Sequence, residues 1–110
     1  MTEVELVGRI QEAVLVGNTR TGLHAVRHMF EEGFNEQDIL SALIGKIRVL
    51  ESYPDESRYL ILGYYQISEK VRSPLHLVVE YTETDLVDIV TAYIPQKPWW
   101  TSPWNRGKSR

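Results

Sequence analysis

Apolar side chains in the first part of the chain recur at the three- and four-residue spacing of an α-helix. Thr2 precedes the first of these runs, and Glu5 stands three residues later, which is the pattern of an N-terminal capping box. Gly17 follows the run and is suited to the left-handed conformation that ends many helices. We therefore expect a first helix between Thr2 and Gly17.

Two shorter helices are predicted after a turn at residues 18–22. The first of the two ends at Gly33, and its expected apolar face consists of Leu23, Val26, Met29 and Phe30. The opposite stripe is polar and consists of His24, Arg27, His28 and Glu31. Asn35 is a suitable N-cap for the third helix, which should end at Gly45.

From Lys46 onward the apolar spacing changes to the two-residue period of a β-strand. Four strands are expected, near residues 46–53, 58–66, 73–82 and 86–94, and three of their four connections are short. Short connections join antiparallel neighbours. The pattern therefore predicts an α+β domain, with two to three N-terminal helices packed on one face of a four-stranded antiparallel meander sheet.

The last fifteen residues differ in character from the rest. We divide the chain into a single α+β domain at 1–95 and a Trp-rich basic tail at 96–110, in which prolines disfavour regular structure. Exposed tryptophans are costly, so at least one of the three should fold back onto the domain or a partner. The tail carries four positive charges, on Lys97, Arg106, Lys108 and Arg110, whereas the whole chain has a net charge of −3.

The remaining residues 1–95 are therefore acidic, and an acidic body does not attract nucleic acid by its long-range field. No DNA or membrane contact is expected. No apolar run approaches the roughly 20 residues of a membrane helix, and the N-terminus lacks the plan of a signal peptide, which predicts a cytoplasmic protein. The chain has no cysteine and no phosphate-binding glycine motif, so no cofactor or metal is predicted.

His76 is a polar residue inside an otherwise apolar strand. It has two interpretations: an acid or base that titrates near neutral pH, or a structural side chain with a hydrogen-bond partner. The pattern favours the second, on a strand face that is mixed and therefore expected to be half exposed. His24 and His28 share one helix face as a metal pair would, but no third ligand is evident, and a polar stripe is favoured.

Arg58 opens the second predicted strand and suits either phosphate binding or an ion pair with Asp55 or Glu56, of which we favour the ion pair. Three strand tyrosines, Tyr64, Tyr81 and Tyr93, are suited either to stacking on bases or to packing of the sheet. Their presence alone does not separate these roles.

Several short motifs recur in a recognisable order along the chain. They are His24–Ala25, Met29, Gly33, Tyr53–Pro54, Leu62–Gly63, the segment Pro74–Val79, and Thr91 with Tyr93. In residues 18–95 the sequence thus resembles the domain of unknown function 4258 family of small bacterial proteins. Such proteins are similar in topology to the RelE and message-interferase toxins, and are often encoded beside a zinc-finger protein that resembles an antitoxin.

The resemblance implies a RelE-like toxin component that cleaves RNA and pairs with an antitoxin of zinc-finger or helix-turn-helix type. A metal-independent ribonuclease needs a base, an acid and a cation close together. The candidate site residues are His76, His24, Arg58 and Tyr93. However, His28 and Glu32 stand where the family usually has arginines, which weakens phosphate binding. The alternative is a catalytically inert protein-interaction module.

Overall fold

Three helices form one layer of the fold. The computed structural model describes residues 1–82 and 84–107, and its helices are α1 (Glu3–Leu15), α2 (Leu23–Glu32) and α3 (Glu36–Ile44). The capping box of Thr2 and Glu5 is confirmed at the start of α1, and Asn35 caps α3 as expected. Gly33 ends α2 in the left-handed conformation with a φ of 81°. No helix among the described residues is long and apolar enough to cross a membrane.

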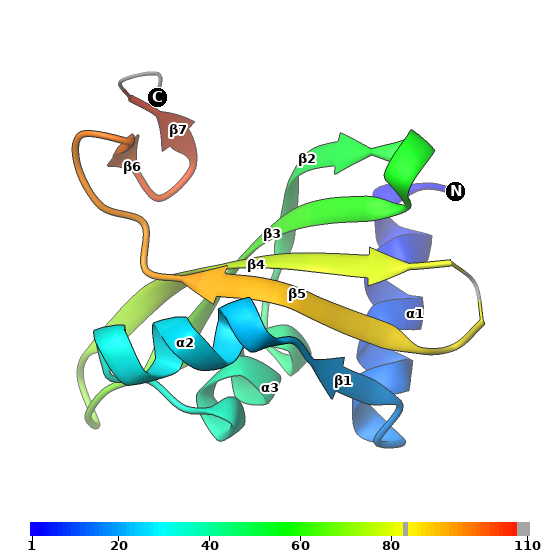
Figure 1. Cartoon of the computed structure of the whole chain (residues 1–110), viewed down its shortest axis with the longest axis horizontal. Coiled ribbons are helices and arrows are strands. Elements are labelled where there is room, and N and C mark those ends of the chain that lie inside the picture. The colour runs from blue at the N-terminus through cyan, green and yellow to red at the C-terminus, as the bar shows by residue number, and fades with distance from the viewer. Residues whose placement is uncertain (83, 108–110) are drawn as a thin grey trace.

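A five-stranded sheet forms the second layer (Figure 1). Its strands are β1 (Thr19–Thr21), β2 (Arg48–Tyr53), β3 (Arg58–Gln66), β4 (Arg72–Tyr81) and β5 (Val87–Tyr93), in the order β1-β5-β4-β3-β2, with the 3-10 turn η1 (Pro54–Glu56) between β2 and β3. Neighbours from β2 to β5 are antiparallel, as predicted. The α+β class is therefore confirmed.

The prediction of exactly four antiparallel strands is wrong, because β1 pairs in parallel with β5. This segment was interpreted as a turn, and three residues are too few to show a two-residue period. The edge of β5 recruits it through the backbone: the Val87 amide donates to the Asn18 carbonyl, and the Gly22 amide donates to the Ile89 carbonyl. An exposed strand edge favours such pairing.

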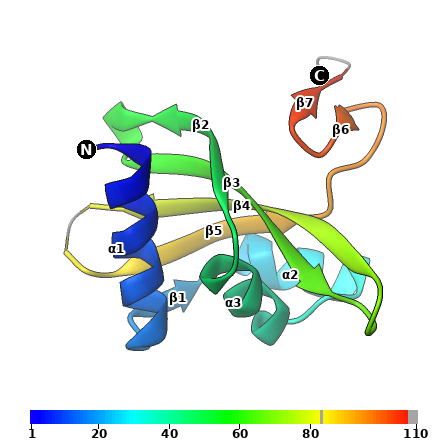
Figure 2. The same cartoon turned by 180° about the vertical axis from the view of Figure 1, so that it is seen from behind.

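The C-terminal segment forms a second, two-stranded sheet from β6 (Trp100–Ser102) and β7 (Asn105–Arg106). The expectation that prolines exclude regular structure here is wrong, because Pro103 lies in the turn between the two strands. Figure 2 shows this hairpin on the side of the main sheet opposite α2 and α3. Trp100 is only 5% exposed, which confirms that a tryptophan folds back. Lys108 and Arg110 lie outside the described residues.

The main core lies between the helices and the sheet. Its fully buried members come from all three helices and from the central strands, and the largest are Ile10, Ile39, Leu43, Ile61, Leu75, Leu77, Val79, Val87 and Ile89. All of the described helices therefore cover the same face of the sheet. The other face of the sheet, which carries His76, is called the far face below.

The predicted apolar face of α2 is wrong at Leu23 and Phe30, whereas Met29 packs against the core and Val26 is half-buried. Leu23 and Phe30 are each 87% exposed, whereas Ala25 is completely buried. Helix α2 packs along β5, where the small Ala25 side chain permits a close approach. The last turns of the helix place His28 and Glu32 next to Tyr93 and Ile94 at the end of β5. Helical spacing identified the helix but not the side that faces the sheet.

Two β-bulges determine which side chains reach the far face. In β2 the register shifts between Val49 and Glu51: Val49 lies opposite Ile61 of the core, but Glu51 lies opposite Leu60. In β5 the register shifts around Val90. A bulge inserts one residue and so reverses the faces of all later side chains.

The bulge in β5 places Tyr93 on the far face, opposite His76. Under strict alternation Tyr93 would share the core face with Val87 and Ile89, which are both fully buried there. The bulge in β2 moves Glu51 to the far face in the same way. The positions of Glu51 and Tyr93 on the far face therefore depend on these two bulges.

Gly63 of β3 allows α3 to pack directly on the sheet, because a Cβ atom there would lie 3.1 Å from the carbonyl oxygen and 3.2 Å from the Cβ of Ala42. We expect Gly63→Val to lower the free energy of unfolding by about 2 kcal/mol through overpacking. Urea unfolding followed by circular dichroism measures this change. The matched control is Gly8→Ala on α1, which has open space around it; equal stability of Gly63→Val and wild type would contradict the packing.

Candidate functional site

His76 of β4 is the centre of the far-face site and is completely buried. The prediction of a half-exposed histidine face is therefore wrong. The cause is the C-terminal hairpin: the Trp100 ring meets the His76 ring edge-on, with ring centroids 4.3 Å apart. A cover contributed by a distant part of the chain cannot be inferred from the alternation within one strand.

Both ring nitrogens of His76 have partners. Nδ1 lies 3.2 Å from the hydroxyl of Tyr93, and Nε2 lies 2.5 Å from the backbone carbonyl oxygen of Pro103. A carbonyl only accepts hydrogen bonds, so Nε2 must carry the proton. In the neutral ring Nδ1 then accepts from the Tyr93 hydroxyl. The expectation that His76 has a hydrogen-bond partner is confirmed, and one of its two partners is Tyr93, which belongs to the same set of motifs.

Burial lowers the pKa of His76 below its ordinary value of 6.5, because the charged ring would lose its hydration. The hydrogen bond to Pro103 and the negative charge of Glu51 oppose this effect, and the positive charge of Arg106 adds to it. Desolvation is the largest of these causes. His76 is therefore neutral at pH 7 and able to accept a proton.

An ion pair fastens the hairpin to the sheet. The Arg106 guanidinium of β7 donates two hydrogen bonds of 2.8 Å to the two carboxylate oxygens of Glu51 on β2. The hydrogen bonds from Arg106 lower the pKa of Glu51, and Glu51 in turn raises that of Arg106. Tyr53 also donates to Glu51, and Arg106 stacks over the Trp100 ring with its central carbon 4.8 Å from the centroid.

A second histidine, His28 of α2, faces the same region from the other side of β5. Its Nδ1 is hydrogen-bonded to a carboxylate oxygen of Glu32, and the other oxygen of Glu32 accepts the backbone amide of Ile94 at 2.8 Å. The His28 and Tyr93 rings are 6.2 Å apart between centroids. Glu32 therefore orients His28 and also ties α2 to the end of β5.

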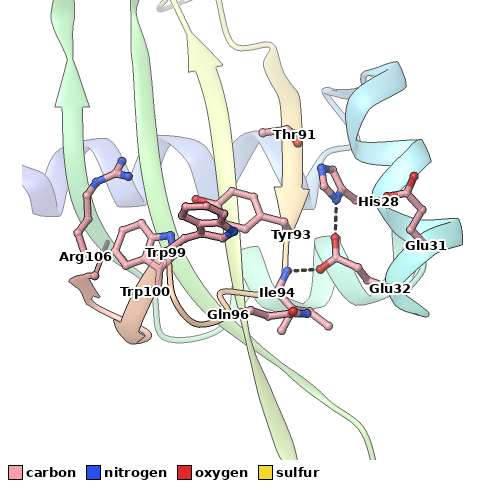
Figure 3. Close-up of a pocket in the computed structure, with 11 residues that line it drawn as sticks. His28, Glu31, Glu32, Thr91, Tyr93, Ile94, Gln96, Trp99, Trp100 and Arg106 are labelled. Carbon is pink, nitrogen blue, oxygen red and sulfur yellow. Dashed lines mark hydrogen bonds and ion pairs between the residues drawn. The ribbon is translucent and has the colours of Figure 1, made fainter. Parts of the chain in front are cut away.

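A cavity of about 780 Å³ lies between α2, the end of β5 and the hairpin. His28, Glu32, Tyr93, Trp100 and Arg106 line it, and His76 lies behind Tyr93 and Trp100 without lining it. Figure 3 shows His28 and Glu32 extending from α2 on one side of the cavity and Arg106 on the other, with Tyr93 and Trp99 between them. The cavity is large enough for a small organic ligand. Its walls combine the aromatic rings of Tyr93, Trp99 and Trp100 with the titratable side chains of His28, Glu31 and Glu32.

The structure brings together two of the four predicted site residues, His76 and Tyr93. His24 is exposed on α2 and does not line the cavity. Arg58 forms the predicted type of ion pair, but its partner is Glu80, at 3.2 Å, rather than Asp55 or Glu56. The reason is the strand register, which places Arg58 directly opposite Glu80 and four residues along β4 from His76.

The other tyrosines separate as well. Tyr81 is buried in the core and is not available for base stacking. Tyr64 lies under the guanidinium of Arg72, outside the cavity. The helix face that His24 and His28 share was interpreted as a polar stripe rather than a metal pair; His24 is exposed, and His28 is hydrogen-bonded to Glu32. Within residues 1–82 and 84–107, no group of three or more metal-ligating side chains is placed to hold an ion.

Sequence reasoning missed most of the residues around His76. Glu51 was assigned to no site because the bulge in β2 leaves no clear mark in the sequence, and Pro103 acts through its backbone. One signal was available for His28 and Glu32, whose four-residue spacing on a helix brings their side chains together. The aromatic and basic composition of the tail was the only sign of Trp100 and Arg106.

The model of the family described as domain of unknown function DUF4258 matches residues 22–94. The chain therefore belongs to this family, as its motifs indicated. Searches of curated proteins and of solved structures found no significant match. The matched segment contains His28, Glu51, His76 and Tyr93, whereas the hairpin that covers His76 lies outside it.

We predict that the depressed pKa of His76 makes stability depend on pH. The unfolded chain binds a proton on His76 more readily than the folded chain does, because the ring is buried in the folded chain. The contribution of His76 to the free energy of unfolding is therefore fully present above pH 6.5 and is lost as pH falls toward its pKa in the folded protein. The slope is at most about 1.4 kcal/mol per pH unit. Glu51, whose ordinary pKa is 4.5, contributes to the pH dependence of stability only at lower pH. Urea unfolding between about pH 7.5 and pH 5 measures the slope.

The test variant is His76→Gln, in which this part of the slope should disappear whatever its absolute stability. His24→Gln removes an exposed histidine of α2 and is the matched control. A slope that is unchanged in His76→Gln would show that the histidine does not cause it.

Proposed function

We propose that this protein is a metal-independent ribonuclease, a RelE-like toxin component that is paired with an antitoxin. The observation that supports the proposal is the presence of two acid–base pairs beside one cavity: Tyr93 with neutral His76, and His28 with Glu32. Cleavage of RNA next to a 2′-hydroxyl requires one group that removes a proton and another that supplies one. The cavity offers both.

Tyr93 and His76 are the proposed base. The 2′-hydroxyl of a bound nucleotide would give its proton to the Tyr93 oxygen as Tyr93 passes its own proton to Nδ1 of His76. The 2′-oxygen then forms a bond to phosphorus. This relay requires a neutral His76 with a free electron pair on Nδ1. Burial favours the neutral ring, and the Pro103 carbonyl holds the one N–H of that ring on Nε2.

His28 is the proposed acid. Glu32 holds its Nδ1, so Nε2 of the protonated ring donates a proton to the 5′-oxygen as the bond from phosphorus to that oxygen breaks. The products are a 2′,3′-cyclic phosphate and a 5′-hydroxyl, and the imidazolium of His28 also supplies positive charge next to the phosphate.

Trp99 is the proposed stacking surface for a base, because it lines the cavity and is half-buried. Base stacking on aromatic rings tolerates any sequence and requires a single strand. Arg106 also lines the cavity, but its charge is balanced by Glu51. Phosphate binding at this site therefore depends on the His28 ring more than on a free arginine.

The direct test is cleavage of a single-stranded RNA by the purified protein. We expect Tyr93→Phe and His28→Gln each to lower kcat by about 100-fold or more, because each removes one proton-transfer group. The matched controls are His24→Gln, on the same helix as His28, and Arg58→Gln, whose partner is Glu80; both should cleave at the wild-type rate.

A chimeric substrate sharpens this experiment. RNA in which the cleaved nucleotide is replaced by its 2′-deoxy form should remain intact, and the product of normal RNA should carry a cyclic phosphate. Expression of the wild type, but not of Tyr93→Phe, should arrest growth of a bacterial host unless the antitoxin is present. An inactive wild-type protein, or equal loss in the His24→Gln control, would refute the assignment.

The second candidate is a catalytically inert interaction module, and the exposed apolar side chains of α2 favour it. Leu23 and Phe30 are separated by about two helical turns and lie on one side of the helix. Large exposed apolar side chains that gather on one surface are typical of binding surfaces. Here the partner protein would cover α2, and His76 would have a structural role.

A double variant tests the α2 surface on which the second candidate depends. Leu23→Ser with Phe30→Ser should abolish binding to the protein encoded beside this chain, measured by co-purification, and should leave stability within about 0.5 kcal/mol of wild type because both side chains are exposed. The control pair is Val4→Ser with Leu15→Ser on α1, which are also exposed. Equal binding by both variants would rule out this surface.

A further inference from the structure

The Pro103 carbonyl has a consequence for the chemistry of His76. A neutral imidazole carries one N–H, and the ring can place it on either nitrogen. The carbonyl oxygen lies 2.5 Å from Nε2 and accepts that hydrogen, so the electron pair is left on Nδ1, 3.2 Å from the Tyr93 hydroxyl. Only this tautomer can receive the proton of Tyr93.

We infer that the C-terminal hairpin, comprising β6, β7 and the turn at Pro103, is a positioning element that fixes the tautomer of His76 for the reaction. This inference rests on the proposed function and concerns how its base is prepared. The hairpin contributes no group that transfers a proton. It acts through His76, as the third member of a catalytic triad orients its histidine.

Two positioning residues, Glu51 and Arg106, hold the hairpin in place. Arg106 makes two parallel hydrogen bonds with Glu51, and this bidentate geometry fixes orientation as well as distance. The guanidinium also stacks on Trp100, whose ring covers His76. Glu51 faces the hairpin because of the bulge in β2.

Gly107 closes the hairpin at its other end, where its amide donates to the Trp99 carbonyl at 2.8 Å. A Cβ atom at this position would run into the backbone carbonyl oxygen of Pro98. Gly107→Ala therefore displaces the hairpin without changing any charge. Gly8→Ala on α1 is the matched control, because a Cβ there meets nothing.

Charged and titratable groups near His76 also affect its pKa, and their effect must be distinguished from that of the hairpin's position. They are Tyr93 on β5, Glu51 and Tyr53 on β2, and Arg106 on β7. Glu51 raises the pKa of His76 and Arg106 lowers it. The double variant Glu51→Gln with Arg106→Gln removes both opposing charges together, so that release of the hairpin dominates the result.

The experiment follows the His76 ring by ¹⁵N NMR in the full chain, alongside RNA cleavage. In wild type we expect a single Nε2–H tautomer and a pKa below 6.5. In Gly107→Ala and in the Glu51→Gln/Arg106→Gln variant, exposure of the ring should raise its pKa toward about 6.5 and give a mixture of tautomers. The Gly8→Ala control should match wild type.

Cleavage should fall in both hairpin variants by at least about 10-fold in kcat, because the proton acceptor of Tyr93 is misplaced. KM should rise as well, because Trp100, Arg106 and Gly107 line the cavity. The exchanged pair Glu51→Arg with Arg106→Glu restores the ion pair and should recover the wild-type tautomer. A purely structural hairpin would lower stability without moving the tautomer or the pKa of the remaining folded protein.

Two results would overturn the inference. One is a His76 tautomer and pKa that stay at their wild-type values after the Trp100 ring has left His76; the other is a Trp100 ring that stays in place in both variants. Failure of the proposed function appears differently. If wild type leaves RNA intact but the variants shift the tautomer as expected, the hairpin positions His76 and the ribonuclease assignment is wrong.

Discussion

The far face of this protein is organised by one buried histidine that has a hydrogen-bond partner on each ring nitrogen. A buried polar ring is costly unless both nitrogens are satisfied, and here the partners are Tyr93 from the neighbouring strand and the Pro103 carbonyl from the hairpin. Burial keeps His76 neutral, and the two contacts select its tautomer. Burial of the site, its protonation state and the position of the C-terminal segment therefore depend on one side chain.

The two contacts of His76 depend on other features of the sheet. Tyr93 reaches His76 only because β5 contains a bulge, and Glu51 reaches Arg106 only because β2 contains another. Bulges that redirect side chains are frequent next to active sites. The hairpin that completes the site lies outside the segment that matches the DUF4258 family. The family segment therefore supplies His76, and the additional segment supplies its cover.

The acid–base groups of the site support an RNA substrate, whereas the distribution of charge does not. The two pairs beside the cavity suit transfer of a proton in each direction, which supports the ribonuclease proposal. The balance of Arg106 by Glu51 and the acidic body of the chain limit attraction of phosphate. The exposed Leu23 and Phe30 of α2 are unused by the site and support a protein partner in either proposal.

The amino-acid sequence by itself determined the helices, their caps, the order of the four long strands and the motif that contains His76, because these depend on local spacing and on residues a few positions apart. Tertiary structure alone decided the fifth strand, the exposed side of α2, the partner of Arg58 and the burial of His76. Each of these depends on strand register, on a bulge or on a contact between distant segments, and a single strand or helix carries no information about which distant segment will cover it.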